Sequence, residues 1–322
     1  MNRIEPVRMK PTASAVDAPT PRPRLALRAR EYLALTKPRV VALIVFTAVV
    51  GMFLATPGLP PLGALVLGTL GIALAAGSAA AVNHILDQRA DAVMARTRAR
   101  PLPTGHLTTR AAAVFAAVLG ALSMAILALG VNWLTAVLTF VSLIGYSFIY
   151  TVWLKHSTPQ NIVIGGAAGA APPILGWTAI TGEVAPDALL LFLIVFLWTP
   201  PHFWALALYR AQEYAKVNIP MLPVIYGREY TQLQILLYTV MLAAVTLMPF
   251  ATRMSGLPYL AGALVLNAGF LYYAWRLYRD YSDALARKTF RYSIQYLSLL
   301  FALLLLDHYR VFIREALQSA LY

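Results

Sequence analysis

The 322-residue sequence contains no cysteine and few charged residues. Without cysteine there is no disulfide, no thiolate nucleophile and no cysteine-ligated metal centre, so any metal must be held by Asp, Glu, Asn or His. Only 12% of the residues are charged and 60% are hydrophobic, whereas soluble domains are about 25% charged. So few charges cannot cover a water-facing surface of this size, which indicates a membrane protein.

Long apolar segments recur along the chain, and a helix needs about 20 such residues to cross a bilayer. Nine windows qualify, at about 38–56, 64–86, 110–130, 132–152, 160–180, 187–208, 233–253, 257–277 and 292–312. We therefore predict an all-α polytopic bundle with nine transmembrane helices, residues 37–322. Residues 1–36 are polar and rich in proline and arginine, which predicts a disordered, basic, cytoplasmic tail without a signal-peptide core.

Acidic residues are half as frequent as basic ones, 13 against 26, and the net charge is +13. With the nine windows in place, 23 of the 26 basic residues fall on the side of the N-terminus, and the opposite side holds Arg253, Arg310 and Arg314. The positive-inside rule then places the N-terminus in the cytoplasm and the C-terminus outside. Topology accounts for most of the charge, and nucleic-acid binding is disfavoured because the basic tail lacks interleaved aromatic residues.

Polar residues recur every fourth position where the second window ends. Asn83, Asp87 and Asp91 have the spacing that keeps three side chains on one face of a helix, with His84 pointing off that face. Two carboxylates and an amide oxygen are donors that suit Mg²⁺, which takes water and substrate phosphate beside them. Arginines 96, 98 and 100 follow, and guanidinium groups suit phosphate oxygens. The pattern predicts a site for a diphosphate and Mg²⁺, and a solvated helix end with paired Asp and Arg is the alternative.

A second loop on the same side, after the sixth window, contains Arg210, Glu213 and Lys216. This loop lies on the same predicted side as the aspartates, and a diphosphate carries more charge than one motif can neutralise. Taken alone, however, such a loop is more typical of a solvated connection. It is therefore a candidate second half of the diphosphate site.

Two proline-containing stretches lie within the windows. Pro200 and Pro201 are expected to kink or break the sixth helix. The adjacent His202 is then an ionisable group near a broken helix, a candidate functional residue, with a satisfied core histidine as the alternative. In the second stretch, small residues from 165 to 171 precede Pro172 and Pro173. These small residues indicate close helix packing or room for a bulky ligand.

The motif from Asn83 to Pro101 resembles the first aspartate-rich motif of the UbiA superfamily of intramembrane prenyltransferases. The matching positions are Asn83, Asp87, Asp91, Met94, Arg96, Thr97, Arg100 and Pro101. Two further stretches, residues 150–177 and 198–224, are similar to the branch of that superfamily that modifies haem. The resemblance covers about residues 30–313 and leaves the tail outside.

This resemblance implies a nine-helix UbiA-type bundle that transfers a farnesyl group from farnesyl diphosphate to a vinyl group of haem b. It implies Mg²⁺ as cofactor and assigns roles to residues of both loops. The implied metal ligands are Asn83, Asp87, Asp91 and Glu213; the implied diphosphate ligands are Arg96, Arg100, Lys155, Arg210 and Lys216; the candidate substrate or haem contacts are Tyr146, Tyr150, His202, Trp204 and Tyr214. The superfamily usually carries two or more Asp in the second motif, and this chain has only Glu213 there. The second site would therefore bind diphosphate through Arg210 and Lys216 as much as through Mg²⁺.

Other interpretations stay open at this point. A prenyltransferase of the same superfamily could instead use the aromatic ring of a quinone precursor as acceptor. A transporter is the alternative from a different class, although its ionisable residues would be expected near the membrane midplane rather than at one rim. If the acceptor is haem, we expect the protein to lie in a bacterial inner membrane. Haem A synthase and terminal-oxidase assembly proteins are then possible partners.

Overall fold

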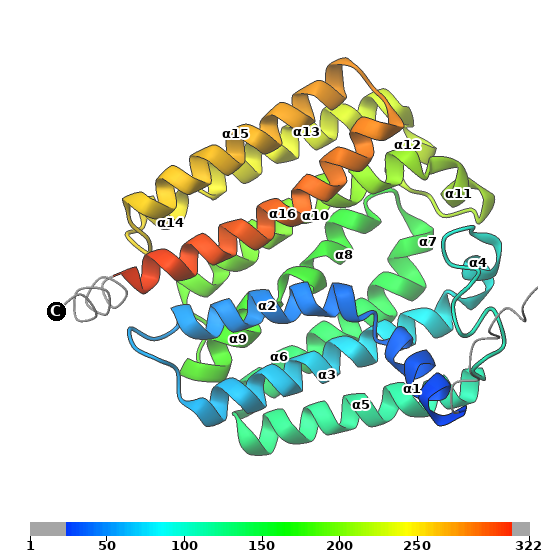
Figure 1. The fold of residues 1–322 in the computed structure, drawn as a ribbon, viewed down its shortest axis with the longest axis horizontal. Helices are drawn as coiled ribbons and strands as arrows, with labels where there is room; N and C mark the ends of the chain where they lie inside the picture. The colour runs from blue at the N-terminus through cyan, green and yellow to red at the C-terminus, as the bar shows by residue number, and fades with distance from the viewer. Residues whose placement is uncertain (1–23, 311–322) are drawn as a thin grey trace, which may run out of the picture.

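The computed structural model describes residues 24–310, and within them every regular element is a helix (Figure 1). The long elements are α2 (Pro38–Leu54), α3 (Leu62–Leu86), α5 (Thr109–Gly130), α6 (Trp133–Ile144), the π-helix η1 (Gly145–Leu154), α8 (Asn161–Ala170), α9 (Pro172–Thr181), α10 (Pro186–Tyr209), α13 (Gly227–Val245), α15 (Leu257–Arg279) and α16 (Asp283–His308). The remaining elements are α1 (Arg24–Leu35) and the short helices α4 (Gln88–Val93), α7 (Lys155–Ser157), α11 (Ala211–Lys216), α12 (Leu222–Ile225) and α14 (Met248–Ala251).

The prediction of nine spans is confirmed for the described part of the chain. Eight helices are long and apolar enough to cross a membrane, and α1 with α2 forms a bent pair that brings the number to nine. Large apolar side chains such as Val66, Phe140 and Leu299 are exposed on the outside of the bundle. In a bilayer these side chains face lipid, which explains why the sequence contains so few charges.

Of the predicted kink or break at Pro200 and Pro201, the break is not observed, because α10 runs through both prolines as one helix. Each proline removes an N–H donor and crowds the preceding turn, and the packing of α10 against α8, α13 and α16 holds the flanking turns in helical geometry. The chain departs from regular α-helix in three other spans. One changes to a π-helix at η1, one divides at Ala171, directly before Pro172, into α8 and α9, and one divides after Val245 into α13 and α14.

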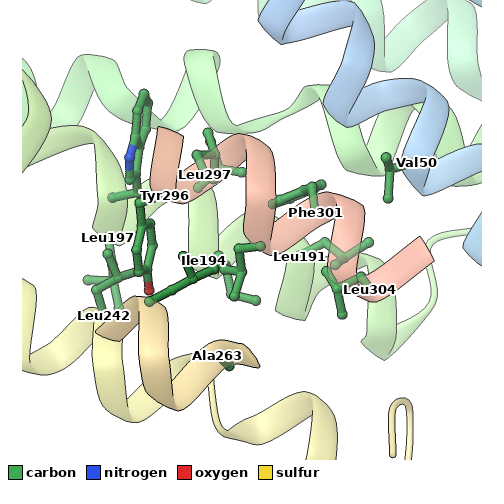
Figure 2. Packing of buried hydrophobic residues seen from close by; sticks show 14 of the residues in the cluster. Val50, Leu191, Ile194, Leu197, Leu242, Ala263, Tyr296, Leu297, Phe301 and Leu304 are labelled. Carbon is green, nitrogen blue, oxygen red and sulfur yellow. The ribbon is translucent and has the colours of Figure 1, made fainter. Parts of the chain in front are cut away.

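The main core lies where α10 and α16 meet, with α15 and α2 beside them (Figure 2). Ile194 and Leu197 of α10 pack there with Tyr296 and Phe301 of α16, and all four are almost fully buried. A second close contact joins α2 to α9. A Cβ atom on Gly176 would lie only 2.7 Å from the Ala48 carbonyl carbon, so the two backbones approach as closely as they do because this residue is glycine.

The predicted disordered tail is partly wrong, because Arg24–Leu35 forms the helix α1. Leu35 is fully buried in a small cluster with Leu102 and Ala116, and the Tyr32 ring packs against Phe115. The apolar residues at the end of the tail therefore contact the bundle instead of staying in water. The rest of the predicted tail, residues 1–23, lies outside the described residues.

The loops of the bundle divide between two ends. In Figure 1 the short helices α4, α11 and α12 lie at one end, and α14 with the end of α16 lies at the other. The first end carries the Asp-containing and Glu-containing loops on which the sequence prediction depends. The two halves of the candidate site are therefore on the same side of the membrane.

Candidate active site

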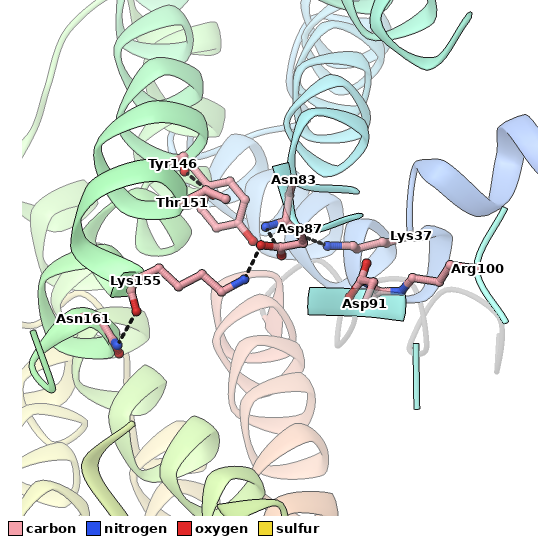
Figure 3. Close-up of polar contacts among 9 residues, drawn as sticks. All are labelled: Lys37, Asn83, Asp87, Asp91, Arg100, Tyr146, Thr151, Lys155 and Asn161. Carbon is pink, nitrogen blue, oxygen red and sulfur yellow. Dashed lines mark hydrogen bonds and ion pairs between the residues drawn. The ribbon is translucent and has the colours of Figure 1, made fainter. Parts of the chain in front are cut away.

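Asn83, Asp87 and Asp91 lie at the junction between α3 and α4. The Asp87 N–H donates to the Asn83 carbonyl at 3.0 Å, and the Asp91 N–H donates to the Asp87 carbonyl at 2.8 Å. The i to i+4 register therefore continues across the junction although α3 ends at Leu86. All three side chains are buried and gather on one side, as the spacing predicts (Figure 3).

Cationic side chains from three separate segments surround these residues. Lys155 Nζ lies 2.5 Å from Asp87 Oδ1, and Arg100 Nη1 lies 2.5 Å from Asp91 Oδ2. Asn83 Nδ2 donates to Asp87 Oδ2 at 3.0 Å, and Lys37 Nζ donates to Asn83 Oδ1. Figure 3 shows Lys155 approaching from one side and Lys37 with Arg100 from the other. We name this group of six residues the acidic cluster after its two aspartates, Asp87 and Asp91. Its other members are Lys37, Asn83, Arg100 and Lys155.

Lys37 is the member of the acidic cluster that sequence reasoning missed. It lies at the bend between α1 and α2, the pair that forms the first span, in a left-handed backbone conformation with φ 49°. The only signal in the sequence is its place directly before Pro38, and nothing local indicates that it reaches Asn83.

The donor set of the acidic cluster fits a divalent cation. Each carboxylate already binds a cationic nitrogen, so both positions are built for positive charge. Within residues 24–310 no group of three His, Asp or Glu side chains could enclose a metal by itself. Two carboxylates and one amide oxygen leave coordination positions for water and phosphate oxygens, as Mg²⁺ prefers.

The second loop forms its own ion pair beside the acidic cluster. Arg210 Nη1 pairs with Glu213 Oε1 across the start of α11. Arg210 Nε and Glu213 Oε2 are buried and have no hydrogen-bond partner among the described residues. A buried polar atom without a partner is costly, so these two atoms are suited to receive a ligand.

The two loops are in contact with each other. Met94, from the loop after α4, packs in the same buried cluster as Tyr214 of α11 and Ile219. Arg96 is exposed, and it is close enough to Tyr214 to influence the pKa of that phenol, which burial raises. Lys216 is exposed, and the structure gives it no ion pair among the described residues. Of the predicted second-loop residues, Tyr214 is thus the one that contacts the first loop, and Arg210 and Glu213 pair with each other on the same loop.

Two tyrosines of η1 form an aromatic wall beside Asp87. The rings of Tyr146 and Tyr150 are stacked with centroids 5.4 Å apart, and the Tyr146 ring points toward Asp87 (Figure 3). A Cβ atom on Gly165 would lie 2.7 Å from Tyr150 Cε2, so the small residue leaves room for this ring. Small residues at this point serve ring packing, one of the two readings the sequence allowed.

His202 and Trp204 lie in helix interfaces instead. The His202 ring is stacked between Trp198 and Phe290, at 4.3 and 4.6 Å, and its Nδ1 lies 2.7 Å from Ser293 Oγ. Trp204 is 1% exposed and packs edge-on against Tyr238. The ring contacts of the two residues, and the hydrogen bond of His202, are with residues of α10, α13 and α16. Trp204 also lies in the buried cluster that contains Met94 and Tyr214.

His84, to which sequence reasoning gave no role, is buried next to the acidic cluster. Its exposed fraction is 2%, and neither ring nitrogen has a hydrogen-bond partner among the described residues. Lys37 and Arg100 are the charged groups near it. The two ring nitrogens of His84 are therefore available as a hydrogen-bond donor and an acceptor on the side of the acidic cluster where Lys37 and Arg100 lie.

The sequence matches a known family and named bacterial proteins. Residues 44–304 match the model of the UbiA prenyltransferase family. The chain is 63% identical over 284 residues to the protoheme IX farnesyltransferase of Nitrosospira multiformis, covering 88% of this chain and 95% of that protein. It is 61% identical to the protein of the same name from Thiobacillus denitrificans, again over 88% and 95% of the two chains.

Solved structures share the fold at low sequence identity. A structure of digeranylgeranylglyceryl phosphate synthase superposes with a TM-score of 0.74 at 17% identity, covering 88% of this chain and 99% of the other. A UbiA homologue from Archaeoglobus fulgidus, bound to GPP and Mg²⁺, gives a TM-score of 0.57 at 18% identity, covering 85% and 99%. The chain belongs to the UbiA prenyltransferase family and is a multi-span membrane enzyme.

Proposed function

We propose that this enzyme transfers a farnesyl group from farnesyl diphosphate to a vinyl group of haem b, giving haem O and pyrophosphate. The observation that carries the proposal is the identity of 57–63%, over most of the chain, to proteins named protoheme IX farnesyltransferase. The geometry supports it, because two buried carboxylates lie among cationic side chains at one membrane rim. A transporter would instead be expected to place its ionisable residues near the membrane midplane.

We assign the metal to the acidic cluster, with Asn83, Asp87 and Asp91 as protein ligands and Glu213 on the opposite loop. A cation held by these residues would supply Lewis-acid withdrawal of charge from the diphosphate oxygens, which would make pyrophosphate a better leaving group. Lys155 and Arg100, which pair with the two carboxylates in this structure, would bind phosphate oxygens of the substrate. Arg96, Arg210 and Lys216 neutralise the departing pyrophosphate from the second side.

Breakage of the C–O bond leaves an allylic farnesyl cation, which the electron-rich vinyl carbon of haem attacks. Water then captures the resulting cation and supplies the hydroxyl group, and its proton passes to the released pyrophosphate. The stacked pair of Tyr146 and Tyr150 lies beside Asp87 and stabilises positive charge on the farnesyl carbons through its ring faces. Tyr214, at the contact between the two loops, borders the same space. We assign His202 to helix packing, because its contacts lie within α10 and α16. Trp204 packs against Tyr238 and lies in the buried cluster of Met94 and Tyr214, beneath the two loops.

We propose the bacterial inner membrane as the location, with the N-terminus in the cytoplasm. The distribution of basic residues supports this orientation, since 23 of 26 share the side of the acidic cluster. The product would then pass to haem A synthase or to terminal-oxidase assembly proteins. The predicted cytoplasmic tail and the periplasmic C-terminus include residues outside the described part of the chain.

The proposal is tested by mass spectrometry of haem extracted from cells with and without the protein. Expression should produce haem of the mass expected for the hydroxyethylfarnesyl derivative. Membranes supplied with labelled farnesyl diphosphate should label haem b and leave 4-hydroxybenzoate unlabelled. Label on the benzoate alone would assign the enzyme to quinone-precursor prenylation.

The roles of the acidic cluster are tested with a pair of variants. Asp87→Ala should abolish Mg²⁺-dependent farnesyl transfer while the protein still inserts in the membrane. Asp283→Asn is the matched control, because Asp283 is an exposed acid at the same end of the bundle, where α16 begins. Full activity of Asp87→Ala would contradict the assigned metal role.

A further inference from the structure

A polar cavity lies at the end of the bundle opposite the acidic cluster. It has a volume of about 580 Å³ and lies between α14, the loop that follows it and the last turn of α16. Residues that line it include Phe250, Arg253, Gly256, Asp307 and Arg310. The 24 residues of α10 span about 36 Å between the two ends, so this cavity is not part of the candidate active site.

The cavity collects basic residues where the chain has very few of them. Only three of the 26 Lys and Arg residues fall on this side of the membrane, and two of those, Arg253 and Arg310, line the cavity. The side chain of Arg253 has no ion pair among the described residues, and its backbone adopts φ 63° in the left-handed region. The positive-inside rule opposes arginine on this side, so topology does not explain why both lie here.

Asp307 balances only part of this charge. Its side chain is 3% exposed, and Oδ2 accepts a hydrogen bond of 2.5 Å from the Gly256 N–H at the start of α15. Its other oxygen, Oδ1, lies 3.4 Å from Arg310 Nη1. The guanidinium of Arg310 lies against Gly256, where any side chain would overlap it. The cavity lining thus contains one carboxylate and two guanidinium groups, beside the positive end of the 23-residue helix α15, which leaves a net charge of about +1.

Apolar side chains beside the cavity are exposed on the lipid-facing surface. Met248, Phe250 and Leu257 are 42%, 37% and 68% exposed. All three lie at the end of a span, where lipid headgroups meet acyl chains. A ligand that matches both features carries one negative charge and an adjoining hydrocarbon chain.

We propose that this cavity binds the phosphodiester headgroup of an anionic phospholipid in the leaflet opposite the acidic cluster. Arg253 and Arg310 contact the phosphate, because planar guanidinium groups match its oxygens. Asp307 holds Arg310 and the start of α15 in place. The acyl chains lie along Phe250 and Leu257. This assignment is independent of the acceptor that the enzyme prenylates.

The test is native mass spectrometry of the purified full-length protein, released from detergent containing phosphatidylglycerol or phosphatidylcholine. The wild type should retain phosphatidylglycerol in preference to phosphatidylcholine. Arg253→Gln and Arg310→Gln should each weaken this retention about tenfold, the effect of losing one charge-assisted hydrogen bond. Arg253→Lys keeps the charge but loses the planar fork, and its retention should be intermediate.

Arg279→Gln is the matched control, because Arg279 is also a basic residue at a span end, over the Trp275 ring at the far end of α15. This variant should retain phosphatidylglycerol as the wild type does. Equal losses in Arg279→Gln and Arg253→Gln, or no loss in either cavity variant, would overturn the proposal. Binding of inorganic phosphate that depends on Arg253 and excludes phosphatidylglycerol would show a soluble-anion site and would also overturn it. Farnesyl transfer in lipid-free detergent should be unchanged in the cavity variants, which shows that they are folded.

Discussion

The ion pair between Lys155 and Asp87 should couple these two residues strongly in the metal-free protein. Nζ and Oδ1 are 2.5 Å apart, and the two side chains are only 11% and 9% exposed. At an effective dielectric constant of about 20, the attraction between the charges is roughly 7 kcal/mol. Desolvation of both groups offsets much of this. Removal of one partner from a buried pair costs about 3–5 kcal/mol, mostly because the other charge is left unpaired.

The perturbation is a double-mutant cycle with Lys155→Met, Asp87→Asn and the double variant. Lys155→Met leaves a buried carboxylate without its cation, and we expect it to lower the free energy of unfolding by about 3 kcal/mol. Asp87→Asn should relieve most of that loss when it is added, because the unpaired charge is then gone. The coupling free energy should therefore reach about 2 kcal/mol or more. Independent sites deviate from additivity by only about 0.3–0.5 kcal/mol.

Reversible unfolding in detergent, followed by tryptophan fluorescence with a chelator present, measures this coupling. The chelator matters because a divalent ion on Asp87 would replace the Lys155 charge and reduce the coupling. Lys216→Met combined with Asp87→Asn is the control, because Lys216 is exposed and has no ion pair among the described residues. Additive effects of Lys155→Met and Asp87→Asn would refute the reasoning. The double variant should stay inactive even where stability is recovered, since catalysis needs both groups.

Four further predictions concern packing, metal, the second loop and the aromatic wall. Gly176→Ala should destabilise the protein by about 1–3 kcal/mol or more, because its Cβ meets the Ala48 backbone, whereas Gly169→Ala in the same span has open space and should not; thermal unfolding distinguishes them. A chelator should abolish farnesyl transfer and added Mg²⁺ should restore it, as a radiolabel assay would detect. Arg210→Met should raise the KM for farnesyl diphosphate about tenfold, and an unchanged KM would remove Arg210 from the diphosphate site. Tyr146→Phe should keep kcat near the wild-type value and Tyr146→Ala should lower it about tenfold, since the ring face and not the hydroxyl acts on the cation.

The sequence was sufficient for the parts of the fold that depend on local composition. The nine windows agree with the spans because a bilayer imposes one length and one polarity on every helix that crosses it. The spacing of Asn83, Asp87 and Asp91 placed all three on one side because the helical register continues across the α3–α4 junction. In both cases a short stretch of chain contains the whole physical cause.

The errors came from contacts with distant residues. Pro200 and Pro201 do not break α10, because α8, α13 and α16 pack against it and it remains one helix. The end of the predicted tail is helical because Leu35 finds an apolar pocket near Leu102. Neither the unbroken helix α10 nor the helical end of the tail can be derived from the residues of that segment alone.

The sequence by itself determined that this is a polytopic membrane protein, which side holds its charge, and which loop carries its paired carboxylates. Only the tertiary structure decided which cations meet them. Lys37, Arg100 and Lys155 come from segments far apart in the chain, and they converge because the helices that carry them pack together. It also separated His202 from the acidic cluster and brought Arg253 to Arg310. Charges interact over distances in space, and a sequence orders residues only along the chain, so partners of this kind are fixed by packing.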